Sequence, residues 1–158
     1  MDAKTAAIDE ELADSYLGFR LGDWGFLLPI STHCEVLERL QVNPIPNVEP
    51  WFSGLLNVRG LIVPVIDLGI LLGVSYTQPK QRYLFTLGRG EKTMAVWIDS
   101  YPQLLSGCAS SFLPTAHETV LPGMLQTFVA KSYVHNDQVW LKVQFEPLFK
   151  TLGQQQAR

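Results

Sequence analysis

The stretch Gly54-Leu-Leu-Asn-Val-Arg-Gly-Leu-Ile-Val-Pro-Val-Ile-Asp-Leu-Gly-Ile-Leu-Leu-Gly73 decides the fold of this 158-residue chain. It is mostly apolar, but Asn57, Arg59 and Asp67 interrupt it. A charged guanidinium in a strand-like apolar run is costly unless it is paired or lies on a hydrated face. The sequence therefore predicts that Arg59 has a partner, either in this chain or in another protein.

Three β-hairpins are predicted on either side of this stretch, because apolar and polar residues alternate there with the period of a strand. Each hairpin has a turn of Gly, Asn or Asp between its two alternating segments. The segments are 16–21 with 24–30, 83–87 with 94–98, and 129–134 with 139–145.

Two short helices are also predicted. Asp67 can cap a helix that ends at Gly73, and Glu146-Pro147 can open a helix that ends at Gly153, since Pro suits the first turn of a helix and Gly its C-terminal end. A weak internal repeat places one such strand-and-helix unit at the end of each half of the chain. Two tandem β-lobes joined by the polar stretch 75–81 are the simplest arrangement, and closing each sheet into a barrel would remove exposed edges.

The composition excludes several classes of protein. The net charge is −3 and no dense run of Lys or Arg is present, which argues against binding to nucleic acid. The apolar run 61–74 contains Pro64 and Asp67 and is shorter than the roughly 20 residues of a membrane span. The N-terminus lacks the features of a secretory signal, so we expect a cytoplasmic protein in which Cys34 and Cys108 are reduced thiols.

No group of residues meets the requirements of a catalytic or metal site. His33 and Cys34 are adjacent in a predicted strand and should point to opposite faces. His117 and Glu118 lie in a loop-like segment without a second His or Cys at the spacing of metal ligands. We therefore expect neither enzymatic activity nor a cofactor.

Large aromatic residues are frequent, among them Trp24, Trp51, Phe52, Trp97 and Trp140. Trp97 and Trp140 fall on the face opposite the aliphatic residues of their strands. They pack in a core or between the two lobes, or they anchor a partner protein, since such residues often dominate the energetics of interfaces. A charged fraction of 17%, against roughly 25% in an average globular protein, mildly favours a protein that works bound to others.

The sequence resembles the CheW-like adaptor family of bacterial chemosensory systems. That family's pattern is a Gly, Asn-x-Arg-Gly, Pro-Val-x-Asp-Leu and a short helix ending in Leu-Gly, and every element occurs between Gly54 and Gly73. The resemblance covers residues 15–153 and weakens after about Gly107. Many relatives carry an Ile-x-Gly step before the last hairpin, whereas the matching segment 127–131 has no Gly.

The resemblance implies an all-β fold of two five-stranded, SH3-like β-barrel lobes around a shared hydrophobic core, with short helices. Residues 1–14 would be a flexible N-terminal extension and residues 154–158 a tail. Residues 15–153 would form one CheW-like domain, with lobe 1 at about 15–74 and lobe 2 at about 82–153.

The resemblance also implies a function without catalysis. Such an adaptor bridges the cytoplasmic tip of a methyl-accepting chemoreceptor to the regulatory domain of a CheA-type histidine kinase. It would sit in the cytoplasm at membrane-bound receptor arrays without entering the membrane. The output would be twitching motility through type IV pili or flagellar chemotaxis. The chain resembles the adaptors of the type IV pilus branch more than those of the flagellar branch.

Two protein-binding sites follow from the resemblance. A receptor helix is expected in a groove between the lobes, near Glu35, Val36, Leu55, Asn57 and Arg59. The kinase is expected to contact lobe 1 through Pro44, Ile45, Pro46, Leu61 and Val63. In the family a Glu after the second strand matches the Arg of Asn-x-Arg-Gly, so Glu35 and Arg59 should form a salt bridge. That pair either takes part in binding or only holds the lobe together.

Two other functions remain open from the residues alone. One is a small β-barrel enzyme or ligand-binding protein, which would need a polar pocket with converging titratable groups. The other is a structural subunit that assembles with copies of itself through this fold.

Overall fold

The structure is a computed structural model that describes residues 15–38, 41–72, 82–106, 113–114 and 127–156. The predicted extension 1–14, the join 75–81, and His117 and Cys108 lie outside these residues. Within the described part, no helix is long and apolar enough to cross a membrane.

One sheet has six strands in the order β8-β1-β2-β11-β10-β9. Its strands are β1 (Tyr16–Leu21), β2 (Trp24–Pro29), β8 (Gln103–Leu105), β9 (Leu113–Pro114), β10 (Val129–His135) and β11 (Gln138–Val143). Neighbours are antiparallel except β2 and β11, which run parallel with Phe26 opposite Leu141. This parallel pairing brings the first hairpin and the last hairpin of the chain into one sheet.

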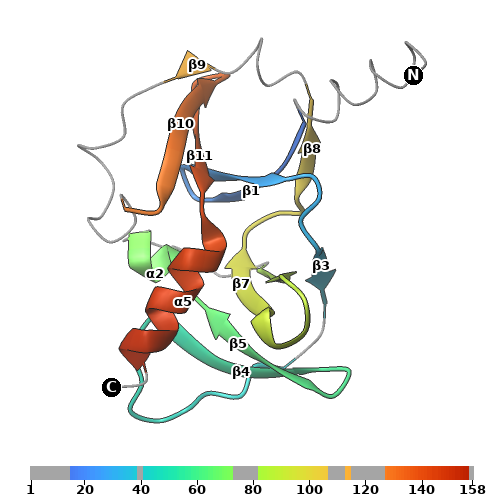
Figure 1. Ribbon diagram of the computed structural model, residues 1–158, viewed down its shortest axis with the longest axis vertical. Coiled ribbons are helices and arrows are strands. Elements are labelled where there is room, and N and C mark those ends of the chain that lie inside the picture. Colours follow the sequence, from blue (N-terminus) through green and yellow to red (C-terminus); the bar gives the residue numbers. More distant parts are fainter. Residues whose placement is uncertain (1–14, 39–40, 73–81, 107–112, 115–126, 157–158) are drawn as a thin grey trace.

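The other sheet has five strands in the order β3-β6-β7-β5-β4. Its strands are β3 (Cys34–Leu37), β4 (Phe52–Val58), β5 (Leu61–Ile66), β6 (Tyr83–Leu87) and β7 (Met94–Ile98). Strands β5 and β7 run parallel, with Val65 opposite Ala95. Figure 1 shows the six-stranded sheet in the upper part of the view and the five-stranded sheet below it.

The predicted all-β architecture of two sheets with few helices is confirmed, but its tandem order is corrected. The strands of the two sheets are interleaved along the chain, since β1 and β2 join β10 and β11 while β6 and β7 join β3 to β5. The sheets therefore do not divide between residues 74 and 82. The physical reason is that two pairs of strands run parallel, β2 with β11 and β5 with β7. These pairs join strands far apart in the sequence, and no local sequence pattern predicts such a pairing.

The shared hydrophobic core lies between the two sheets. Phe19, Phe26 and Leu141 reach it from the six-stranded sheet, and Phe85 and Ile98 reach it from the five-stranded sheet. A second buried cluster on the other face of the five-stranded sheet includes Leu37, Leu56, Val58, Val63, Val65, Leu84 and Ala95. Each strand of this sheet thus contributes alternate residues to two different cores.

Two helices border the shared core. Helix α2 (Leu68–Leu72) follows β5, and helix α5 (Phe145–Gln156) follows β11 and runs beside both sheets in Figure 1. The prediction that the last helix ends at Gly153 is wrong, because α5 continues to Gln156. Gly153 does not take the left-handed conformation that ends many helices, and the neighbouring Leu148 and Leu152 are fully buried.

Candidate functional site

The turn between β4 and β5 accounts for the Asn-x-Arg-Gly motif. Arg59 and Gly60 have φ angles of 51° and 89°, which are typical of a two-residue type I′ hairpin turn. The Asn57 side chain supports the turn, because its Oδ1 accepts a hydrogen bond from the Gly60 backbone N–H at 2.9 Å. Arg59 thus occupies a position that favours Gly or Asn, and a non-Gly residue held there often serves a function.

Glu35 and Arg59 form the predicted salt bridge. Arg59 Nη2 lies 2.7 Å from Glu35 Oε2, and Nη1 lies 3.2 Å from Oε1, so the contact is bidentate. Both side chains face solvent, with exposed fractions of 72% for Arg59 and 43% for Glu35. The hydrogen bond from Arg59 is the main cause that lowers the pKa of Glu35. Such an exposed pair contributes little to stability.

The remaining residues predicted for the receptor site are dispersed around this pair. Asn57 belongs to the same turn, and Leu55 lies two residues earlier on the same face of β4, half-buried. Val36 follows Glu35 on β3 and is half-buried against the shared core, on the face opposite Glu35. The structure therefore brings Glu35 into contact with Arg59, with Asn57 in the same turn as Arg59 and Leu55 two residues before Asn57 on β4.

The residues predicted for the kinase site divide by exposure. Pro44 and Pro46 are exposed in the segment before β4, and Ile45 and Leu61 are half-buried. Val63 is a correction, since its side chain is completely buried in the second cluster and contacts no solvent.

Sequence reasoning missed Ile62, which lies between Leu61 and Val63 and is 56% exposed. It pairs across the hairpin with Asn57. The prediction of Val63 as a kinase contact thus takes the buried face of β5 for its exposed face, because a shift of one position exchanges the two faces of a strand. The available signal was the pairing across the hairpin, which places Ile62 opposite the polar residue Asn57.

Asp67, the last polar residue of the deciding stretch, holds the chain where β5 meets α2. Its carboxylate is 8% exposed, and its Oδ2 lies 2.9 Å from Nη2 of Arg82. Its Oδ1 accepts the Ile70 backbone N–H at 3.2 Å, as predicted for a helix cap. Asp67 is therefore structural.

The tryptophans pack inside the molecule to different degrees. Trp140 is 3% exposed, in a third cluster with Leu27 on the outer face of the six-stranded sheet, and the Arg20 guanidinium lies 4.9 Å from its ring centroid. Trp97 is half-buried, and its indole N–H donates to Ser53 Oγ at 3.1 Å. Packing in this third cluster thus accounts for Trp140, which is not part of the shared core between the two sheets.

In the described part of the chain, His33 and Cys34 do not form a nucleophilic site. Partial burial raises the pKa of the Cys34 thiol, which opposes formation of the reactive thiolate. The backbone carbonyl of His33 accepts the N–H of Gly88 at 2.9 Å. Among the described residues, no group of three or more His, Cys, Asp or Glu side chains could hold a metal ion.

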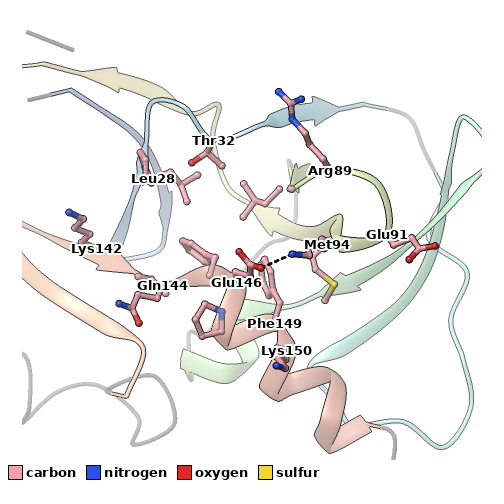
Figure 2. Close-up of a pocket in the computed structure, with 17 residues that line it drawn as sticks. Leu28, Thr32, Arg89, Glu91, Met94, Lys142, Gln144, Glu146, Phe149 and Lys150 are labelled. Atoms are coloured by element: carbon pink, nitrogen blue, oxygen red, sulfur yellow. Dashed lines mark hydrogen bonds and ion pairs between the residues drawn. The ribbon is translucent and has the colours of Figure 1, made fainter. Parts of the chain in front are cut away.

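A cavity of about 850 Å³ opens at the junction of the two sheets and helix α5. Its lining comes from the end of β2, the β6–β7 hairpin, and the segment where β11 leads into α5 (Figure 2). Apolar side chains make up its centre, namely Leu28, Leu87, Met94, Val143, Phe145 and Phe149. None of the five residues predicted for the receptor groove lines this cavity.

Comparison with known proteins connects this fold and surface to a family. A family model described as the CheW-like domain matches residues 15–152, which include all but the ends of the chain. The chain belongs to the CheW-like domain family. Its deciding stretch, the Asn57–Gly60 turn and the Glu35–Arg59 pair therefore belong to a CheW-like adaptor domain.

Individual relatives are moderately similar. Protein PilI of Pseudomonas aeruginosa is 29% identical over 130 residues, covering 80% of this chain and 70% of that protein. The chemotaxis protein CheW of Klebsiella aerogenes is 30% identical over 108 residues, covering 66% of this chain and 64% of that protein. The chain thus spans slightly less than two thirds of that CheW protein.

A solved structure shares the fold. The scaffolding protein TtCheW from Thermoanaerobacter tengcongensis superposes with a TM-score of 0.71 at 21% sequence identity, and the match covers 87% of this chain and 88% of that one. The two-lobed architecture of CheW-like proteins is therefore present here.

Proposed function

We propose that this chain is a non-catalytic adaptor that couples methyl-accepting chemoreceptors to a CheA-type histidine kinase. The observation that carries the proposal is the CheW-like domain, which extends over residues 15–152. Members of this family act as scaffolds, and the chain's fold matches that of a scaffolding protein.

The arrangement of surfaces supports a bridging role, because a coupling protein needs two separate binding sites. One surface, proposed for the receptor, combines the exposed Glu35–Arg59 pair with the apolar cavity between the sheets and α5. The other, proposed for the kinase, carries the exposed residues Pro44, Pro46 and Ile62. An amphipathic helix in an apolar groove is a common mode of recognition.

We assign the receptor to the cavity and, outside its lining, to Glu35, Val36, Leu55, Asn57 and Arg59. We assign the kinase to Pro44, Ile45, Pro46 and Leu61, with Ile62 in place of the buried Val63. Scaffolding on these two sites makes kinase activity depend on receptor conformation at cytoplasmic arrays. Twitching motility is the proposed output, supported by the similarity to PilI.

Binding measurements with two partners test this proposal. Calorimetry titrates the chain with the regulatory domain of a CheA-type kinase and with a chemoreceptor tip fragment from the same organism. Arg59→Ala is the test variant and Lys131→Ala, which replaces an exposed residue of β10, is the matched control. Circular dichroism establishes that both variants are folded.

Saturable binding of both partners by the wild type and the control supports the adaptor. Loss of receptor binding alone in Arg59→Ala assigns Arg59 to the receptor surface. Failure of the wild type to bind either partner contradicts the proposed function and leaves the fold unaffected.

A further inference from the structure

The net charge of the residues that line the cavity is opposite in sign to the net charge of the whole protein. The chain has a net charge of −3. Four cationic side chains line the cavity, Arg89, Lys92, Lys142 and Lys150, with two anionic ones, Glu91 and Glu146. The lining thus has a formal charge of +2, and a local excess of one sign attracts partners of the other.

One cation and one anion of the lining neutralise each other. Lys92, on the β6–β7 hairpin, places its Nζ 3.1 Å from Glu146 Oε1 in the first turn of α5. The dashed line in Figure 2 marks this contact. The ion pair joins the five-stranded sheet to the helix across one side of the cavity, and its two charges cancel in the net charge of the lining.

The cations that remain lie on different sides of the apolar centre, as Figure 2 shows for Arg89, Lys142 and Lys150. Lys142 is partly engaged, because its Nζ lies 5.4 Å from the centroid of the Tyr16 ring. Arg89 and Lys150 are exposed, and neither forms an ion pair with a carboxylate within the described part of the chain. They are the cations available to a bound partner.

We propose that this cavity binds an amphipathic helix of a partner protein whose apolar face is flanked by Asp or Glu side chains that pair with Arg89 and Lys150. The apolar centre, with Met94 and Phe149, receives the anchor side chains of the helix. The inference rests on the proposed function in that the partner is the chemoreceptor tip, and it adds the charge that this receptor helix must carry.

Electrostatic complementarity of this kind acts mainly on specificity and on the rate of association. An acidic flank brings the helix toward a basic rim, while a basic flank is repelled by it. Because Arg89 and Lys150 are exposed, salt screens their attraction within a Debye length of about 8 Å at physiological ionic strength. Binding of an acidic helix therefore weakens as salt is added.

The test uses three synthetic 18-residue helical peptides with the same leucine face and with Glu, Gln or Lys flanks. The protein is labelled with ¹³C at its methionine methyl groups, and Met94 is one of three methionines in the chain. Because Met94 lines the cavity, movement of its resonance during a titration reports binding at this place. The variant Arg89→Glu/Lys150→Glu reverses the rim, and Lys131→Glu is a control of equal type outside the cavity.

The expected result is that the Glu peptide shifts the Met94 signal and binds about tenfold more tightly than the Lys peptide. The double variant reverses this order, and the Lys131→Glu control retains it. Equal binding of the three peptides, no shift of Met94 with any of them, or an unchanged order in the double variant overturns the proposal. A Met94 shift that depends on protein concentration without peptide also overturns it, since a second copy would then occupy the cavity.

Different results would contradict the acidic-helix proposal and the adaptor function. A receptor fragment that binds the wild type and the double variant equally well contradicts the acidic-helix proposal and leaves the adaptor function standing. A wild type that prefers the Glu peptide but binds neither receptor nor kinase contradicts the adaptor function and leaves the cavity's charge preference intact.

Discussion

The bidentate contact between Glu35 and Arg59, with Nη2 and Oε2 2.7 Å apart, links the two opposite margins of the five-stranded sheet. Glu35 lies on edge strand β3, and Arg59 lies in the turn that follows edge strand β4. The contact requires the sheet to curl until these margins meet. The second buried cluster, which includes Leu37 of β3 and Leu56 of β4, fills the inside of that curl.

Replacement of Arg59 separates a binding role from a structural one. Arg59→Gly removes the salt bridge and relieves the backbone strain of φ = 51°, whereas Arg59→Ala removes the salt bridge and keeps the strain. We expect the thermal midpoint of Arg59→Gly to equal or exceed that of Arg59→Ala, with both losing receptor affinity. Differential scanning calorimetry and a receptor titration measure the two effects. Normal receptor binding by both variants would show that the pair is only structural.

The Glu35 carboxylate makes part of the stability depend on pH. Arg59 lowers its pKa below the usual value of 4.5, so the stabilisation is fully present above that pH and is lost as the pH falls through the lowered pKa. An NMR titration should find the pKa of Glu35 lower in the wild type than in Arg59→Ala. Identical pKa values in the two proteins would mean that the salt bridge is not maintained in solution.

Gly25 and Gly153 form a matched pair of glycine substitutions. A Cβ atom on Gly25 would overlap the Trp140 indole and lie 2.7 Å from Nη1 of Arg20, whereas a Cβ atom on Gly153 meets no atom within 4 Å. Gly25→Ala should destabilise the fold by about 2 kcal/mol through overpacking. Gly153→Ala should stabilise helix α5 by about 0.5–1 kcal/mol.

Urea denaturation of both variants measures these changes. The reverse order of stability would contradict the packing of Trp140 over the six-stranded sheet.

Asp67 combines a helix cap with a largely buried ion pair. Asp67→Ala loses both the hydrogen bond to the Ile70 N–H and the contact with Arg82, and we expect a loss of about 3 kcal/mol. Asp67→Asn keeps an oxygen for the cap and loses the charge, so its loss should be smaller. Chemical denaturation checks the order, and an equal loss in both variants would assign the whole effect to the ion pair.

The sequence predicted the local features well, because they follow from neighbouring residues. The three hairpins, the Asp67 cap and the contact between Glu35 and Arg59 depend on alternation, on turn chemistry or on the resemblance of one continuous motif. The burial of Trp140 had a weaker signal in Gly18 and Gly25, since Gly within a strand often marks a close approach of another group.

The features that sequence reasoning missed are nonlocal or depend on a single position. The parallel pairings of β2 with β11 and of β5 with β7 join distant segments, which a repeat within each half does not reveal. Val63 and Ile62 exchange faces with a shift of one residue. The cavity arises only where both sheets meet α5, so no stretch of sequence contains its apolar centre or its basic rim.

Reconstitution of signalling tests the central claim most directly. The measurement is the rate of autophosphorylation of a CheA-type kinase with receptor-containing membranes from the same organism, with and without this chain. The account predicts that the rate responds to receptor ligand only when the chain is present, and that Arg59→Ala abolishes the response. A kinase rate that does not change when the folded chain is added would contradict the adaptor function.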